Sequence, residues 1–277
     1  MMGRKRTVQK LLRLAVFAGV IAVAWGGAVL GWRWKENAKC ERIEVLGAVH
    51  ADRQRLLDLA RIQVGMSLFD IDPVLTADRV RRHPWVKQAM VERVPTGTVR
   101  IRVTERVPVA EALSPTGAPA YFLDDTGVKL PIVEDAAYDV PLIRGIRTSE
   151  EKAPAVGNAS VRALLASLAG LLPETNAVLS DFELQRSGDI LLHTTPIDAR
   201  GSMLVRLGKG DYTEKLKKLA AFWQQAVLPQ PEKTFAWIDL RFNGQIVTQE
   251  EVSSPPSVES SHMRLARDDE PAPSAGH

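Results

Sequence analysis

The chain contains a single cysteine, Cys40, among its 277 residues, so an intrachain disulfide is excluded. Its folded part must therefore be stabilised by a hydrophobic core, and the length is ample for one large or two modest domains. An excess of charge of one sign is also lacking, because 36 Lys and Arg residues stand against 33 Asp and Glu residues. The hydrophobic fraction of 45% excludes both a wholly disordered chain and a polytopic membrane protein.

Recognisable catalytic motifs are absent as well. The sequence has no GxSxG or HExxH motif. The histidines are far apart and match no zinc-binding spacing: His50, His83, His193, His262 and His277. We therefore predict no metal, no cofactor and no enzymatic activity.

Two segments resemble functional motifs only superficially. Gly208-Lys209-Gly210-Asp211 lacks the spaced first glycine and the hydroxyl residue of a phosphate-binding loop. We interpret it as a tight turn whose Asp211 caps the following helix. Asp124 and Asp125 would point to opposite faces of a strand and are better explained as part of a hairpin turn, Asp124-Asp125-Thr126-Gly127.

The longest uncharged segment, Leu14 to Trp32, has 19 residues and would span about 28 Å as a helix, which matches the hydrocarbon core of a bilayer. Basic residues dominate the segment before it, and without them the chain is near neutral, which disfavours nucleic-acid binding. By the positive-inside rule the N-terminus stays in the cytoplasm and the rest is exported. The alternative is a signal peptide cleaved after Ala22-Val23-Ala24, although the apolar run continues beyond that point.

The sole thiol follows the apolar segment closely. Such a cysteine can be lipidated or pair between chains, but Lys39 and Glu41 flank Cys40 without a lipobox. An incidental residue is the interpretation that we favour.

A small α/β module follows in the order β-α-α-β-β. The hydrophobic pattern predicts a strand over 41–48, helices over 52–62 and 73–82, and strands over 85–94 and 98–104. Asp72-Pro73 is typical of an N-cap followed by a first-turn proline.

The next region is predicted to be mainly β. Hairpins are expected over 121–130 and 182–194 and a strand over 202–207. Helices are expected from Asn158 to a stop at Pro173, and over 212–227. A closing strand over 235–242 is followed by Asn243-Gly244, which either turns the chain into a last strand over 245–248 or forms a bulge. The Ser/Pro-rich, charged segment from Glu251 onward is expected to be disordered.

These segments together resemble the FtsQ (DivIB) family of bacterial cell-division proteins over about residues 1–250. The resemblance is carried, in the family's order, by ERIEVLGA, HPWVKQAMVERVPTGTVRIRVTERVPVA, YFLDDTGVKL, LGKGDYTEKLKKLAAFW and WIDLRFNGQIV. It implies an α+β fold: one N-terminal transmembrane helix, a POTRA module, and a mixed β domain with two helices packed on an antiparallel sheet. The expected divisions are a cytoplasmic tail 1–13, a transmembrane helix 14–32, POTRA 41–107, the β domain 108–250 and a disordered tail 251–277.

The resemblance also implies a function. The protein is expected to be a non-enzymatic bitopic scaffold of the division machinery that links early and late division proteins. It would lie in the inner membrane at the septum, with its body in the periplasm. Its expected partners are FtsB and FtsL, with other division proteins contacting the POTRA module.

In this family FtsB is thought to add a strand at the edge formed by the last strands. The expected partner-binding residues are therefore Arg241, Phe242, Asn243, Gly244, Gln245, Ile246 and Val247, with Arg186 as a weaker candidate. Arg241 would bind a partner carboxylate and Phe242 would bury apolar area, although the family often has tyrosine at that position. Alternatively, Arg241 is a solvated surface cation and Phe242 belongs to the core. The arginines of the first module are interpreted as an exposed helix face rather than an anion site: Arg53, Arg55, Arg61, Arg81 and Arg82.

Two other classes of protein remain open. A POTRA-bearing secretion or outer-membrane assembly factor would receive client strands by the same edge pairing. That class usually ends in a membrane barrel, and the sequence has no series of alternating barrel strands. A membrane-anchored envelope hydrolase would need catalytic residues that the sequence does not present.

Overall fold

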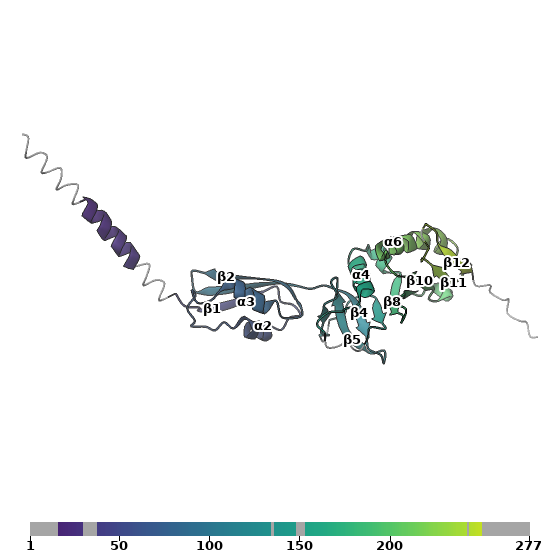
Figure 1. Cartoon of the computed structure of the whole chain (residues 1–277), viewed down its shortest axis with the longest axis horizontal. Helices are drawn as coiled ribbons and strands as arrows, with labels where there is room; N and C mark the ends of the chain where they lie inside the picture. Colours follow the sequence, from purple (N-terminus) through teal and green to yellow (C-terminus); the bar gives the residue numbers. More distant parts are fainter. Residues whose placement is uncertain (1–15, 30–37, 134–135, 148–152, 243, 251–277) are drawn as a thin grey trace, which may run out of the picture.

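The computed structural model describes residues 16–29, 38–133, 136–147, 153–242 and 244–250. Figure 1 shows an N-terminal helix apart from two folded units that lie end to end. Residues 16–29 are helical and their side chains are exposed. Across these described ranges, no helix has the length and apolar content required to cross a membrane. The predicted tails, 1–13 and 251–277, and both ends of the predicted span lie outside the described residues.

The first unit, residues 38–107, has the predicted β-α-α-β-β order. Its elements are β1 (Arg42–Leu46), α2 (Arg53–Ala60), α3 (Pro73–Val80), β2 (Val86–Val94) and β3 (Thr98–Glu105). The strands form a sheet in the order β1-β3-β2, in which β3 pairs parallel with β1 and antiparallel with β2. A parallel pair requires a crossover connection, which the two helices and β2 supply.

Local sequence signals explain why these helices begin where they do. The Asp52 carboxylate accepts a hydrogen bond from the backbone N–H of Arg55 at 2.7 Å. The Asp72 carboxylate accepts from the N–H groups of Val74 and Leu75, and Pro73 occupies the first turn, as predicted. The five arginines named above for this module are all exposed, which supports an exposed polar face.

The second unit, residues 108–250, is built on a nine-stranded sheet in the order β12-β11-β10-β9-β8-β7-β4-β5-β6. Its strands are β4 (Pro108–Leu113), β5 (Pro119–Asp124), β6 (Lys129–Leu130), β7 (Leu142–Arg144), β8 (Leu179–Leu184), β9 (Ile190–Thr194), β10 (Leu204–Gly208), β11 (Phe235–Asp239) and β12 (Val247–Glu250). The expectation of an antiparallel sheet is wrong, because β4–β7, β7–β8 and β10–β11 pair in parallel. Helices lie between β7 and β8 and between β10 and β11, and a helical crossover brings the next strand back in the same direction.

The helices of this unit are α4 (Ala159–Leu168), α5 (Pro173–Asn176) and α6 (Tyr212–Phe222), with a 3₁₀ turn over Asp198–Arg200 and a π-helical turn, η3, over Trp223–Val227. Asn158 caps α4 as predicted, accepting from the N–H of Val161 at 3.1 Å. Two predicted details are wrong. Pro173 begins α5 instead of ending α4, since proline fits the first turn of a helix. Asp211 makes no side-chain cap, because its backbone has φ 51°.

One hydrophobic core packs α4 and α6 against the sheet. Leu164, Leu165, Leu216 and Leu219 share a buried cluster with strand residues such as Phe182. These apolar side chains of both helices therefore face the sheet. This arrangement covers one face of the strands with helices.

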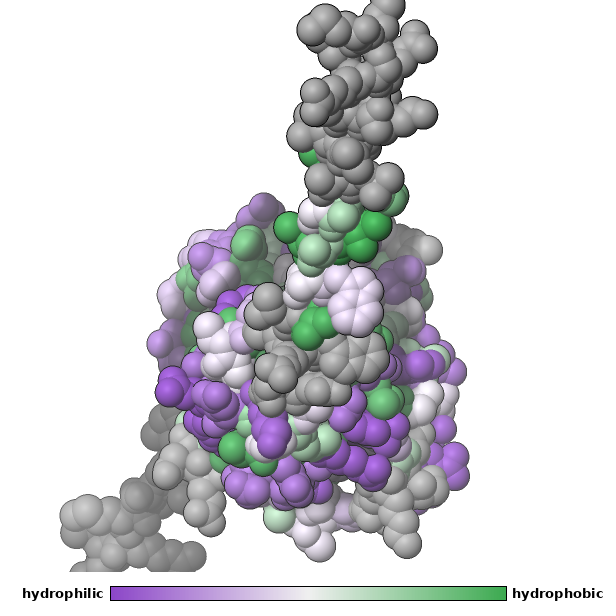
Figure 2. Space-filling model, turned by 90° about the vertical axis from the view of Figure 1, so that its left-hand side faces the viewer, coloured by the Kyte–Doolittle hydropathy of each residue, from purple (hydrophilic) through white to green (hydrophobic). Residues whose placement is uncertain are grey.

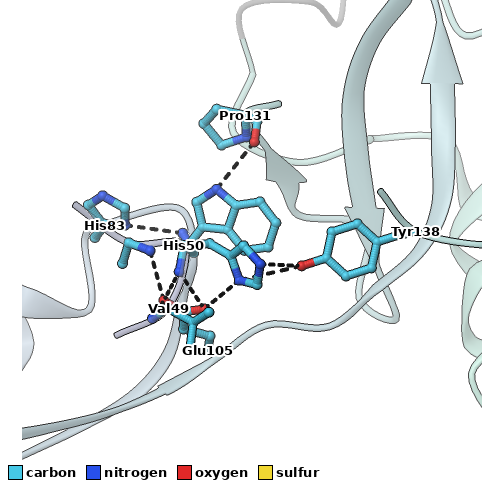
Figure 3. Close-up of polar contacts among 8 residues, drawn as sticks. Val49, His50, His83, Glu105, Pro131 and Tyr138 are labelled. Carbon is cyan, nitrogen blue, oxygen red and sulfur yellow. Dashed lines mark hydrogen bonds and ion pairs between the residues drawn. The ribbon is translucent and has the colours of Figure 1, made fainter. Parts of the chain in front are cut away.

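A second core joins the two units. Phe122 and Leu130, from β5 and β6, belong to the same buried cluster as Trp85 of the first unit. The Trp85 indole N–H donates to the Pro131 carbonyl at 3.2 Å, and Tyr138 lies beside His50 (Figure 3). The ion pair between Arg106 and Asp124, at 2.6 Å, ties the junction further. The units are thus packed together rather than strung on a free linker.

Candidate partner-binding edge

The nine-stranded sheet ends at β12, and within the described part of the chain this strand pairs with β11 alone. An edge strand presents a row of N–H and C=O groups that a strand from another chain can satisfy. Gln249 and Glu250 are exposed, while Val247 and Thr248 are partly buried. The edge is therefore accessible, most fully at Gln249 and Glu250.

The strands at this edge differ from those predicted. β11 ends at Asp239 rather than at 242, although the N–H of Leu240 still donates to the Arg206 carbonyl at 2.9 Å. The last strand covers Val247–Glu250 rather than 245–248. Gly244 adopts φ +80° in the turn between the two strands. Of the seven C-terminal site residues predicted, only Val247 lies in the edge strand itself.

Arg241 is engaged within the chain. Its Nε donates to both carboxylate oxygens of Asp239, at 2.9 and 3.0 Å, and an Nη group donates to one of them at 2.6 Å. The backbone N–H of Arg241 donates to the same carboxylate at 3.0 Å. Burial by itself raises the pKa of Asp239, but these hydrogen bonds and the charges of Arg241 and Arg206 outweigh it and hold the pKa below its ordinary value.

The aliphatic part of the Arg241 side chain packs against the end of β10. Gly208 has φ +66°, and a Cβ there would lie 2.8 Å from the Cγ of Arg241. Next to this glycine, the buried ammonium of Lys215 donates to the carbonyls of Leu207 and Lys209 at 2.8 and 2.9 Å. Burial lowers the pKa of Lys215, the largest of several influences. The Arg241 side chain is therefore positioned by the end of β10, while it remains about half exposed.

The remaining predicted partner-binding residues near Arg241 differ in how exposed they are. Phe242 is 47% exposed, so it is not a core residue. Gly244 and Gln245 are exposed, whereas Ile246 is partly buried against the main core. Asn243 lies outside the described residues.

Arg186 is exposed in the turn between β8 and β9, at one end of the sheet. This turn lines a cleft of about 910 Å³ together with Arg147 and Glu183. Because Ile190 pairs with Gly208, the turn lies at the same end of the sheet as Arg241. The structure thus brings two predicted cations to one end of the sheet.

The sequence did not reveal the role of Trp237. The Arg206 guanidinium lies 4.9 Å from the centroid of its ring, and the indole N–H donates to the side chain of Gln249 at 2.6 Å. These residues lie on the sheet face opposite the helices, beside the β12 edge. The alternation of Trp237, Asp239 and Arg241 in the sequence was the signal that could have indicated a shared polar face.

The chemistry of this edge is that of binding. Its described residues offer backbone groups, a half-exposed phenylalanine and cations. In the residues that the structure describes, no group of three or more His, Cys, Asp and Glu side chains could hold a metal ion.

Comparison with known proteins gives consistent matches along the chain. Residues 38–106 match a family described as "POTRA domain, FtsQ-type", and residues 107–249 match one described as "FtsQ/DivIB, C-terminal related". Cell division protein FtsQ of Rhodothermus marinus is 45% identical over 255 residues, which cover 92% of each chain. Its counterpart in Salinibacter ruber is 40% identical over 84% of this chain and 89% of that protein. A solved extracytoplasmic domain of DivIB from Geobacillus stearothermophilus covers 45% of this chain and 97% of its own, at 14% identity and a TM-score of 0.32.

Proposed function

The chain belongs to the FtsQ/DivIB family of cell-division proteins, and on this premise we propose that it is a non-enzymatic scaffold of the division machinery that binds partners through the β12 edge. The partners are the periplasmic segments of FtsB and FtsL. One of them, FtsB, pairs a strand with Val247–Glu250. Membership of this family favours a division scaffold over a secretion factor or an envelope hydrolase.

The observation that best supports this proposal is the accessible outer edge of β12. A partner strand there gains main-chain hydrogen bonds, and its alternate side chains reach Phe242 on one side and the Trp237 face on the other. Gly244, Gln245 and Ile246 hold the turn that positions the strand, and Asn243, another predicted partner-binding residue, precedes them in the sequence. Arg186 supplies a cation at the end of the sheet. We assign Arg241 mainly to holding Asp239, with its exposed half facing the partner.

We further propose that residues 14–32 anchor the protein in the inner membrane, with residues 1–13 in the cytoplasm, and that the POTRA domain, 41–107, and the β domain, 108–250, are periplasmic at the septum. The support is the 19-residue apolar segment behind a basic N-terminus. N-terminal sequencing of the membrane fraction tests it. A mature terminus at Trp25 would mean that the segment is cleaved as a signal peptide.

The test of the edge uses the full chain in lipid nanodiscs and the purified periplasmic segments of FtsB and FtsL. Phe242→Ala should weaken binding, while the control Met90→Ala, at an exposed apolar residue of β2 in the first unit, should not. Equal affinity of the two variants would remove Phe242 from the site.

Two proline substitutions in β12 test whether the partner strand forms main-chain hydrogen bonds with this edge. Successive N–H groups of a strand point to opposite sides, so of Val247 and Thr248 one faces β11 and the other faces the free edge. Both Val247→Pro and Thr248→Pro should abolish binding, but only one of them should lower the melting temperature appreciably. Retained binding by the variant that melts normally would contradict strand addition.

A further inference from the structure

The end of the first unit that follows the apolar N-terminal segment carries exposed apolar side chains. We call this end the tip, and it comprises residues 38–40, 61–75 and 93–97. Its exposed apolar residues are Val64, Met66, Phe69, Val74 and Leu75, of which the two valines are 67% and 72% exposed. Figure 2 views the molecule from the end that carries the N-terminal helix, and hydrophobic patches interrupt the hydrophilic surface there.

Backbone hydrogen bonds hold the tip to the start of the folded unit. The N–H of Cys40 donates to the Met66 carbonyl at 2.7 Å, and the N–H of Leu68 donates to the Ala38 carbonyl at 2.9 Å. Arg93 donates to the Leu68 carbonyl at 3.3 Å, which ties the turn between β2 and β3 to the same place. The apolar loop is thus fixed beside the point where the chain enters the unit.

The length of the connection limits how far the tip can lie from a membrane. Ala38 follows Trp32, the end of the apolar segment, by six positions along the chain. A fully extended chain covers at most about 3.6 Å per residue, so the tip lies within roughly 20 Å of the end of that segment. The interfacial zone of a bilayer occupies about 5–8 Å of this distance on each side.

Charges at the tip are nearly balanced. Lys39, Arg61 and Arg93 accompany Asp70 and Asp72, and two further acids, Glu41 and Glu92, directly adjoin the tip. The carboxylate of Asp72 is occupied by the N-cap of α3. Attraction to anionic lipid therefore does not drive contact, and the acids restrict it to a shallow depth, where apolar side chains are buried among headgroups.

We propose that the tip rests on the outer surface of the bilayer that anchors the chain, with Val64, Val74 and their apolar neighbours lying at headgroup depth. This surface contact would orient the whole periplasmic body relative to the membrane, because the two units are packed together. The inference rests on the proposed membrane anchor.

The experiment uses the full chain in vesicles of phosphatidylethanolamine and phosphatidylglycerol. Cys40 is first replaced by alanine, and an environment-sensitive fluorophore is attached at Val64→Cys or Val74→Cys. The control is Val49→Cys, because Val49 is also a highly exposed valine but lies at the opposite end of the first unit, where its N–H donates to Glu105. A nitroxide quencher on the lipid headgroup should reduce fluorescence at positions 64 and 74, with a blue shift, and leave position 49 unchanged.

Flotation of the same vesicles after alkaline extraction separates the two ideas. A chain that floats while its three labels are equally quenched, or equally unquenched, would overturn the tip contact and leave the anchor standing. A chain that does not float would overturn the anchor and the tip contact with it.

Discussion

The hydroxyl oxygen of Tyr138 lies 3.0 Å from Nε2 of His50, so a hydrogen bond joins a side chain of the second unit to a side chain of the first. Nδ1 of His50 lies 2.9 Å from the Glu105 carboxylate. Burial alone raises the pKa of Glu105, but hydrogen bonds from the Ala51 N–H and from His50 outweigh it and lower the pKa. The ionised carboxylate can only accept, so Nδ1 of His50 donates to it. The Tyr138 ring also contacts Trp85 and Phe122.

Tyr138→Phe should therefore reduce the free energy of unfolding by about 1 kcal/mol, the usual net contribution of one hydrogen bond. Tyr138→Ala should cost more, because it also removes the ring contacts across the junction. Urea unfolding of the detergent-solubilised chain measures both. If the two variants were equally stable, the ring contacts would contribute nothing to the junction.

Arg241→Ala should destabilise the second unit by about 1–3 kcal/mol at neutral pH, because it leaves the buried carboxylate of Asp239 without its main donors. In the wild type the folded-state pKa of Asp239 is depressed, so its contribution to stability is present above the unfolded pKa near 4 and is lost as the pH falls through the folded value. In the variant, burial remains and raises that pKa.

The stability difference between wild type and Arg241→Ala should consequently shrink as the pH is lowered from 7 toward 4. Urea unfolding at both pH values measures it. A difference that stays constant with pH would show that Asp239 is not the group affected. A binding defect of this variant must be corrected for lost stability, which is why Phe242 is the cleaner probe of the edge.

Gly208→Ala should destabilise the protein more than Gly210→Ala. Both glycines have nearly the same positive φ, +66° and +65°. Placing an alanine in this backbone conformation should therefore cost about 1–2 kcal/mol of stability at either position. Only at position 208 would the new Cβ meet the Arg241 side chain, and nothing lies within 4 Å at position 210. The difference between the two melting temperatures reports the fit of Arg241 against β10, and equal values would contradict it.

Cys40 should react slowly with maleimide in the native protein and rapidly in urea. Its side chain is 1% exposed within the core of the first unit, and burial raises the pKa of the thiol, which disfavours the reactive thiolate. The alternatives of lipidation and interchain pairing both need an accessible sulfur. Equal labelling rates in the two conditions would revive them.

The secondary structure of the first unit was predictable because its signals are local. Caps at Asp52 and Asp72 and the alternation of Val99, Ile101 and Val103 each act within a few residues. The pairing of the strands in the second unit was not predictable. A strand such as β8, which contains Phe182, has the same alternation of buried and exposed residues whether its neighbours run parallel or antiparallel to it. Pairing direction is decided by the helical crossovers that the chain makes between strands.

The partner-binding residues were predicted through the family resemblance, and their local arrangement needed the structure. Asp239 appears in the sequence as one more outward polar residue of a strand, yet it is buried and holds Arg241. Nothing in the spacing indicates that the residue two positions later would fold back on it. Likewise, the partnership of Trp237 with Arg206 requires the parallel pairing of β10 and β11.

The proposed binding edge is also the last part of the sheet to become available during synthesis. β12 has only β11 to pair with in the described sheet, and β11 pairs with β10 across the intervening α6 and η3. Until all of these have left the ribosome and packed, no edge of this kind exists. A chain that stops before β11 would present the side of β10 instead, so a partner that recognises β12 selects molecules whose sheet is complete through β12.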